Sequence, residues 1–195
     1  MAQQVINNGT IAGDGTGESL FSAFDKTNNN FVELYKVAGW GSYAQSDATA
    51  QTITATDSKL VIDGGGTESN SSYLPLEIRG ISELWDTTNN KITPISIGDG
   101  YTMRIDFEIT GKTGNPNGLD ISLDIGGGAT PSNVFIERVV STRKATPYGV
   151  SVAFPFYSLS DFKTNGGQIF LKTDTGTLTI TKRMISIHRI SSGTI

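Results

Sequence analysis

The chain has 195 residues, of which 36% are hydrophobic and 17% charged, and its formal net charge is −4. This acidic balance, with no cluster of Lys and Arg, argues against nucleic acid as a partner, and no apolar run is long enough to predict a membrane span. The absence of cysteine excludes disulfides and thiolate chemistry. The length fits one domain with or without an arm, and 23 glycines among many Ser, Thr and Asn residues favour an all-β fold.

Residues 1–16 are polar and contain several Asn and Gly residues, with isolated Val5 and Ile11. They lack the basic start and the apolar core of a signal peptide. Such a segment has too little apolar surface to fold by itself, so we expect a flexible attachment arm that becomes ordered on a partner.

Residues 17–36 carry the one convincing helical pattern, and Glu18 is expected in the first turn, where a carboxylate stabilises the positive end of the helix dipole. Apolar or small residues then recur at alternating spacings of four and three, which is a heptad seam. The seam consists of Leu20, Phe24, Thr27, Phe31 and Leu34, and it is widened by Phe21 and Tyr35.

A helix of this length with Asn28, Asn29 and Asn30 in its middle is not expected to be stable alone in water. It therefore needs a partner, and three alternatives are open. The helix could pair with copies of itself in a trimeric coiled coil, it could dock on another protein, or it could cover one end of the chain's own β domain.

The same stretch resembles a short N-terminal element of tailed-bacteriophage virion proteins, which include tail-fibre, baseplate-associated and head-appendage proteins. That element reads Gly-Thr-Gly, an acidic residue and Ser-Leu, followed by Ala-Phe and then by Asn-x-Asn-Phe-x-Glu-Leu-Tyr. Residues 15–20, 23–24 and 28–35 match its three parts. Phe21 departs from it, because a polar or charged residue is common at that position. The resemblance implies a structural protein of a phage virion.

Residues 37–50 are predicted to be a linker that holds two aromatic residues. Trp40 lies between Gly39 and Gly41. We expect its side chain to plug the rim of the core rather than to bind a ligand.

From residue 51 to residue 195, short alternating segments with turn signals between them predict a β domain. The clearest strand is 101–110, and we expect it to form a hairpin with 119–125 that has one buried and one solvated face. Residues 169–171 and 178–180 are expected to form a second hairpin. Other short strands are expected near Ile53 and at 60–62, 74–78, 134–140, 150–156 and 185–187, with Pro75 placing 74–78 at an edge.

Within 134–140, Phe135 and Val139 are out of phase with the other apolar residues of the strand. An apolar second face is typical of an inter-subunit contact, so these two residues are predicted to lie between subunits.

About nine strands with no helical pattern between them predict a jelly-roll-like antiparallel β-sandwich. The order of a short helix before a compact sandwich also resembles the trimeric heads of phage fibres and of the tumour-necrosis-factor and C1q family. The predicted fold class is therefore mainly β, with a short N-terminal helix.

The chain offers little for catalysis. His188 is the only histidine, and it is expected at a surface or an interface. Asp106, Glu108, Asp120 and Asp124 fall on the polar faces of two predicted strands and could approach a glycosidase-like pair, but a solvated face answered by Arg104 is the preferred interpretation. We therefore expect no enzyme activity, no cofactor and no metal.

Taken with the resemblance, these observations predict a homotrimeric surface appendage of a virion, assembled in the host cytoplasm and anchored to other virion proteins by its arm and helix. One small head on one short stalk favours a capsid decoration or head fibre, and a tail-fibre or baseplate component stays open. The alternative from another class is a carbohydrate-binding module, or a weak glycan hydrolase, that contacts host polysaccharide. Its loop aromatic residues would be Trp85, Tyr101, Tyr148 and Tyr157.

Overall fold

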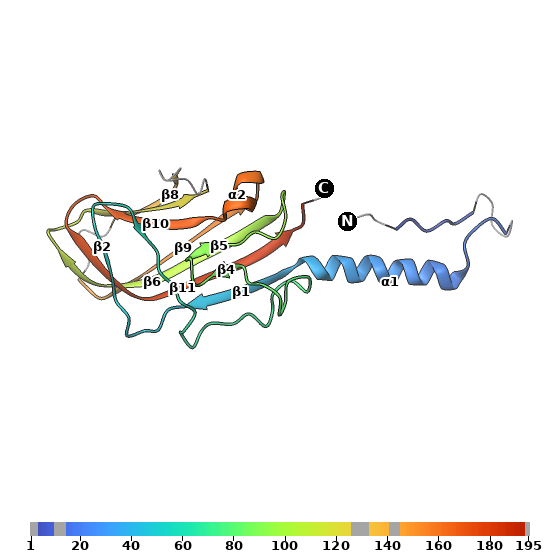
Figure 1. Cartoon of the computed structure of the whole chain (residues 1–195), viewed down its shortest axis with the longest axis horizontal. Coiled ribbons are helices and arrows are strands. Elements are labelled where there is room, and N and C mark those ends of the chain that lie inside the picture. Colours follow the sequence, from blue (N-terminus) through green and yellow to red (C-terminus); the bar gives the residue numbers. More distant parts are fainter. Residues whose placement is uncertain (1–3, 10–14, 126–132, 141–144, 194–195) are drawn as a thin grey trace.

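The computed structural model of the chain describes residues 4–9, 15–125, 133–140 and 145–193. It consists of a β head and a helix, α1 (Leu20–Val37), which projects from one end of the head along the long axis of the molecule (Figure 1). The head is a sandwich of two antiparallel sheets, as the alternating pattern predicts.

Sheet A has the strand order β1-β11-β6-β9, with β2 also paired to β11, and sheet B has the order β3-β10-β7-β8. A small hairpin, β4–β5, and a short helix, α2 (Ser160–Asn165), accompany them. The strands are β1 (Gly39–Ala44), β2 (Gln51–Ile53), β3 (Ser58–Lys59), β4 (Trp85–Asp86), β5 (Lys91–Ile92), β6 (Gly100–Thr113), β7 (Gly118–Asp124), β8 (Asn133–Val140), β9 (Tyr148–Tyr157), β10 (Gln168–Thr173) and β11 (Thr177–Ser191).

The core lies between the two sheets and is built by the period-2 alternation of their strands. In β6 the five alternating apolar residues that were predicted to share a face are all buried, and Thr102 and Arg104 between them are not. Sheet B supplies the opposite half through Leu119, Ile121 and Leu123 of β7. Alternation along these strands therefore predicted correctly which side chains enter the core.

Both predicted hairpins are wrong in their pairing. β6 pairs with β9 and β11 in sheet A, whereas β7 pairs with β8 and β10 in sheet B. In the same way β10 belongs to sheet B and β11 to sheet A. In each of these pairs the chain crosses from one sheet to the other. The sequence could not show this, because alternation marks a buried face but does not say whether the two strands are neighbours in one sheet or face each other across the core.

The two crossings meet at the end of the head that is remote from α1. Gly114 has a φ of +76° and Gly176 a φ of +60°, a region that side chains with a Cβ rarely adopt. A Cβ added at Gly114 would lie 2.9 Å from the Cα of Gly176. Glycine is therefore required at both turns by conformation and by close approach.

Three further expectations about the head are corrected. The predicted linker 37–50 contains β1, which pairs with β11 over its whole length. The predicted edge strand 74–78 is instead a turn, in which the amides of Ile78 and Arg79 donate to the carbonyl of Pro75. The predicted segments 178–180 and 185–187 belong to the single strand β11. Its register shift between Thr181 and Met184 had hidden this continuity.

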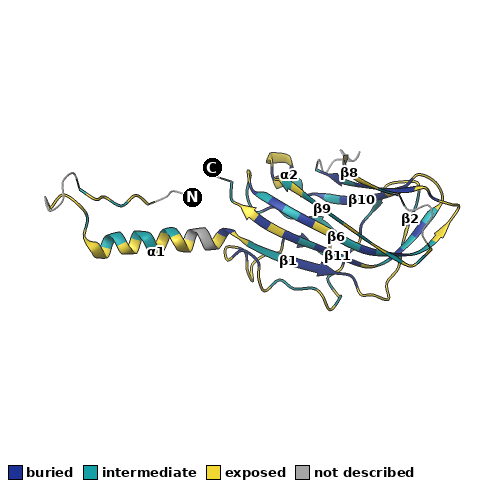
Figure 2. Ribbon diagram, turned by 180° about the vertical axis from the view of Figure 1, so that it is seen from behind, coloured by how far each residue is buried: buried dark blue, intermediate teal, exposed yellow. Residues whose placement is uncertain are grey.

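α1 begins at Leu20 rather than at Glu18, because the hydroxyl of Ser19 is the N-cap and accepts from the amide of Ser22 at 3.1 Å. It ends at Val37, where Ala38 turns the backbone to the extended conformation of β1. Val37 is buried where α1 meets β11, but the rest of the helix stands clear of the head (Figure 2). The alternative in which α1 covers the chain's own β domain is therefore wrong. Among the described residues, no helix is long and apolar enough to cross a membrane.

Because α1 stands clear of the core, removing residues 1–36 is expected to leave a folded head. Among the residues whose burial the structure describes, the buried apolar ones begin at Val37 and Tyr43, which the deletion leaves in place. We expect the truncated chain to keep its β circular dichroism and to unfold in one cooperative thermal transition. A truncated chain that is aggregated or unfolded would show that α1 supports the core.

Candidate functional site

The exposed apolar stripe of α1 is the first candidate site. Five large apolar side chains on the helix have exposed fractions between 49% and 81%, namely Leu20, Phe21, Phe24, Phe31 and Val32. Four of them belong to the predicted seam and its flank, and Val32 was missed because it lies outside the heptad pattern. Thr27 of the seam is half-buried, and its hydroxyl donates to the carbonyl of Ala23 at 2.9 Å. The side chains of Leu34 and Tyr35 lie outside the described residues.

The arm runs back along α1 and is hydrogen-bonded to it (Figure 1). The side-chain amide of Asn30 donates to the carbonyl of Gln4 and accepts from its amide, both at 3.0 Å. The ammonium of Lys26 donates to the carbonyl of Val5 at 3.0 Å. Residues 4–9 of the predicted flexible arm are therefore ordered on their own helix.

The arm covers the polar side of α1 and leaves the apolar stripe open. On a helix with 3.6 residues per turn, Ser22, Lys26 and Asn30 follow one another at i+4 and form a ridge beside the stripe, not on it. The amide of Asn7 donates to a carboxylate oxygen of Glu18 at 3.1 Å, so the arm is held near both ends of this ridge. The stripe thus remains available for a partner outside the described part of the chain.

Acid is expected to loosen the arm. Hydrogen bonding to the ammonium of Lys26 lowers the pKa of the Glu18 carboxyl below its ordinary value of 4.5. A carboxyl with a lowered pKa contributes stability above its ordinary pKa and loses that contribution as the pH falls through the lowered value. Proteolysis within residues 4–9 by an acid-active protease, measured relative to an unstructured reference peptide at the same pH, should therefore be faster below pH ~4 than at pH ~6. Glu18→Gln should make the two rates alike, and an unchanged pH dependence would contradict this role.

The four predicted glycan-contact residues do not form a platform. Trp85 is 1% exposed and its indole donates to the carbonyl of Ile62 at 3.1 Å, and Tyr101 is 0% exposed. Both are core residues, which corrects their prediction as glycan contacts, and Tyr101 is the first buried residue of β6. Tyr148 is half-buried against the core, and Tyr157 is exposed at the end of β9. No two of them present aromatic faces to a common surface.

A different aromatic group lies at the base of α1 and was missed. Trp40 is stacked between Tyr73 and His188, with ring centroids 5.2 Å and 5.9 Å away and interplanar angles of 18° and 19°. The register of β1 against β11 sets Trp40 directly opposite His188, and this pairing could not be known from the sequence. Both faces of the indole are covered, so Trp40 stabilises the junction between α1 and the head. This role is close to the predicted one, in which Trp40 plugs the rim of the core.

The structure bears on only one member of the predicted inter-subunit pair, Val139. Val139 packs against the core, and the side chain of Phe135 lies outside the described residues. The physical reason is a bulge in β8, where the register shifts so that Ile121 opposes Glu137 and Ser122 opposes Phe135. One extra residue resets the alternation, so an out-of-phase side chain returns to the core.

The acidic side chains do not converge. Asp106 and Glu108 belong to β6 in sheet A, whereas Asp120 and Asp124 belong to β7 in sheet B. The expectation that these strands are adjacent is therefore wrong, and a glycosidase-like pair across them is not formed. In the described ranges, no group of three or more His, Cys, Asp or Glu side chains could hold a metal ion.

Most of these carboxylates form ion pairs with basic neighbours. Arg104 lies 2.8 Å from Asp106, as expected, and Arg138 donates to both carboxylate oxygens of Asp120 at 2.6 and 2.8 Å. This bidentate contact lowers the pKa of the Asp120 carboxyl. Ion pairs of this kind are typical of a solvated sheet surface.

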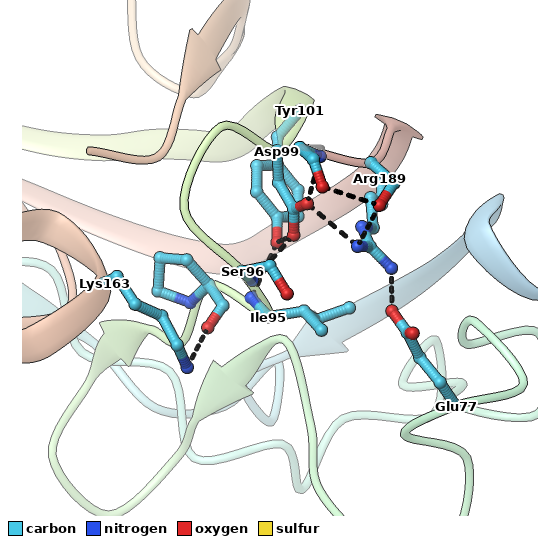
Figure 3. A network of polar contacts seen from close by, with 10 residues as sticks. Glu77, Ile95, Ser96, Asp99, Tyr101, Lys163 and Arg189 are labelled. Atoms are coloured by element: carbon cyan, nitrogen blue, oxygen red, sulfur yellow. Dashed lines mark hydrogen bonds and ion pairs between the residues drawn. The ribbon is translucent and has the colours of Figure 1, made fainter. Parts of the chain in front are cut away.

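A buried polar network closes the end of the head next to α1 (Figure 3). Asp99 is 0% exposed and accepts from the guanidinium of Arg189 at 2.8 Å, from the hydroxyl of Tyr101 at 2.8 Å and from the amides of Ser96 and Gly193. Arg189 also pairs with Glu77. Burial raises the pKa of the Tyr101 hydroxyl, which therefore remains a donor. The network ties β6 and β11 to the chain around Glu77 and thus fixes the base of the stalk.

No family model matches the chain, and no curated protein matches its sequence. Among solved structures, the chain is similar to the Eiger tumour necrosis factor from S. frugiperda, with 8% identity over 81% of this chain and 96% of that chain and a TM-score of 0.50. The vertex protein P5 of PRD1 is 12% identical over 80% of this chain and 99% of that chain, with a TM-score of 0.47. The first comparison confirms the predicted fold class, a jelly-roll-like sandwich similar to that of tumour necrosis factor, and neither identifies a function.

Proposed function

We propose that the chain is a structural protein of a tailed-bacteriophage virion, a homotrimeric surface appendage that is attached by its arm and α1 and that presents its head outward. The observation that carries the proposal is the apolar stripe of α1. It stands clear of the head, and the arm contacts the polar ridge beside it and leaves it open. Large apolar side chains exposed in a row are typical of a surface that is covered in an assembly.

The spacing of the predicted heptad seam, to which three residues of the stripe belong, favours copies of this chain as the covering partner. Leu20, Phe24, Thr27 and Phe31 repeat at four, three and four residues, and a seam of this period packs against an equivalent seam in a left-handed coiled coil. A trimer would also match the helix-before-sandwich order that was compared above with trimeric heads. The virion element matched at residues 15–35 supports the location, and a single small head on a short stalk favours capsid decoration over a long tail fibre.

Two measurements test this function. Light scattering of the purified chain should give three times 20.8 kDa, and a monomer at micromolar concentration would contradict the trimer. Mass spectrometry of purified phage particles should find the chain at many copies per particle. Its absence from particles would contradict the structural role, and a particle reconstruction would then separate a capsid position from a tail or baseplate position.

A further inference from the structure

An apolar groove runs along one lateral edge of the head, between β8 and β9. These strands are the last strands of sheet B and sheet A, and each is paired on one side only in the order of the described strands. The groove has a volume of about 580 Å³. Its apolar lining includes Leu123, Ile125, Val134, Ile136, Phe154 and Phe156.

The opposite lateral edge of the head carries two prominent apolar side chains. The segment that follows Asn70 runs along the free edge of β1, where the amide of Trp40 donates to the carbonyl of Tyr73 at 2.8 Å. It then turns and exposes Leu76 and Ile81, which are 52% and 81% exposed.

The groove and the exposed side chains of Leu76 and Ile81 lie at the same level along the strands of the head. One row of residues crosses sheet A in the order Phe156, Tyr101, Arg189 and Gly39, as the strand registers require. Phe156 lines the groove at one end of this row. At the other end Gly39 touches Pro75, since a Cβ added there would lie 2.3 Å from the nitrogen of Pro75. Leu76 is the next residue after Pro75. The groove therefore lies at one end of this row of sheet A, and Leu76 lies at the other end.

Each edge also carries one charged side chain without a counter-ion among the described residues, and the two charges are opposite. Asp161 lies exposed in the lining of the groove, and no ion pair or hydrogen bond engages its side chain within the described chain. Arg79 lies exposed between Leu76 and Ile81. Its guanidinium donates to the carbonyl of Leu74 at 2.7 Å and has no carboxylate partner in the part of the chain that the structure describes. A cation and an anion in these positions would be electrostatically complementary across an interface.

We infer that Leu76 and Ile81 of one copy enter the β8–β9 groove of the next copy, with Arg79 beside Asp161. The inference rests on the proposed trimer. A cyclic trimer requires a heterologous contact, in which one surface of each subunit meets a different surface of its neighbour at the same height. The groove and the Leu76–Ile81 segment lie at opposite ends of one row of sheet A and so meet this requirement. The contact between the heads would then continue the proposed contact between the α1 helices.

Cross-linking tests the contact directly, because the chain has no cysteine of its own. The double variant Leu76→Cys with Val134→Cys should give covalent dimers and trimers with a short bismaleimide. Each single variant should stay uncross-linked. As a matched control, Leu76→Cys with Thr56→Cys pairs the same position with an exposed residue near the turns remote from α1, and should also stay uncross-linked. Equal yields in the two double variants would overturn the inference.

Charge reversal in the cross-linking variant separates the contact from a general effect of mutation. Arg79→Glu should lower the cross-linking yield about tenfold by placing two carboxylates together, and adding Asp161→Arg should restore it. A yield that does not change with Arg79→Glu, or that is not restored, would overturn the inference. If the wild-type chain remains three times 20.8 kDa in that case, only this contact fails and the proposed trimer stands. A monomeric wild-type chain would contradict both the proposed trimer and this contact.

Discussion

Phe31→Asp is expected to convert the proposed trimer into a monomer of 20.8 kDa without unfolding the head. Phe31 lies in the apolar stripe of α1 and is 55% exposed in the single chain, so the substitution does not disturb the core. In the proposed three-helix seam the same side chain would be buried by its two neighbours. An unpaired buried carboxylate costs several kcal/mol per subunit. Light scattering measures the mass, and circular dichroism reports on the head.

Asn29→Asp is the matched control, since Asn29 is exposed on the same helix away from the stripe. It adds the same charge and should leave the mass at three times 20.8 kDa. A trimer that survives Phe31→Asp would show that the stripe is not the seam. Loss of the β circular dichroism signal in Phe31→Asp would show instead that α1 is part of the folding unit.

Asp99→Asn should reduce the free energy of unfolding by about 3 kcal/mol, because the buried guanidinium of Arg189 would keep only the carboxylate of the partly exposed Glu77 as its counter-ion. Arg189 is 2% exposed, and its guanidinium would lose its contact with the fully buried carboxylate of Asp99. The amides of Ser96 and Gly193 would lose a charged acceptor as well. Urea unfolding followed by tryptophan fluorescence measures the change.

Arg104→Ala supplies the comparison for this second substitution. Its ion pair with Asp106 is also 2.8 Å long, but the Arg104 side chain is 57% exposed. An exposed pair contributes about 0–1 kcal/mol, so this variant should unfold close to the wild type. Equal effects of Asp99→Asn and Arg104→Ala would contradict the view that the buried network holds the base of the stalk.

The functional surfaces were predictable to different degrees. The stripe of α1 could be found because its residues are close in sequence, and a heptad spacing places them on one face of a helix. The glycan-contact residues could not be assigned in the same way. Trp85 and Tyr101 were both predicted as glycan contacts, but the carbonyl of Ile62 accepts from the indole of Trp85 and the carboxylate of Asp99 accepts from the hydroxyl of Tyr101, so that their polar atoms are satisfied inside the core.

The groove between β8 and β9 was beyond the reach of the sequence. Val134, Phe154 and Phe162 belong to three separate elements, and only the order of strands in the two sheets brings them together. The docking of the arm was missed for a similar reason. Its contacts with Lys26 and Asn30 are made by backbone atoms of residues 4 and 5, which no side-chain pattern encodes.

The sequence by itself determined that the chain has one amphipathic helix before a β domain and which faces of the main strands are buried. These properties depend on local periods of 3.6 and 2 residues. Only the tertiary structure decided that β6 and β7, and likewise β10 and β11, lie in opposite sheets. Alternation shows that a face is buried but not what covers it. That choice follows from contacts between residues far apart in the chain, whose energies are comparable for several pairings until the whole core is packed.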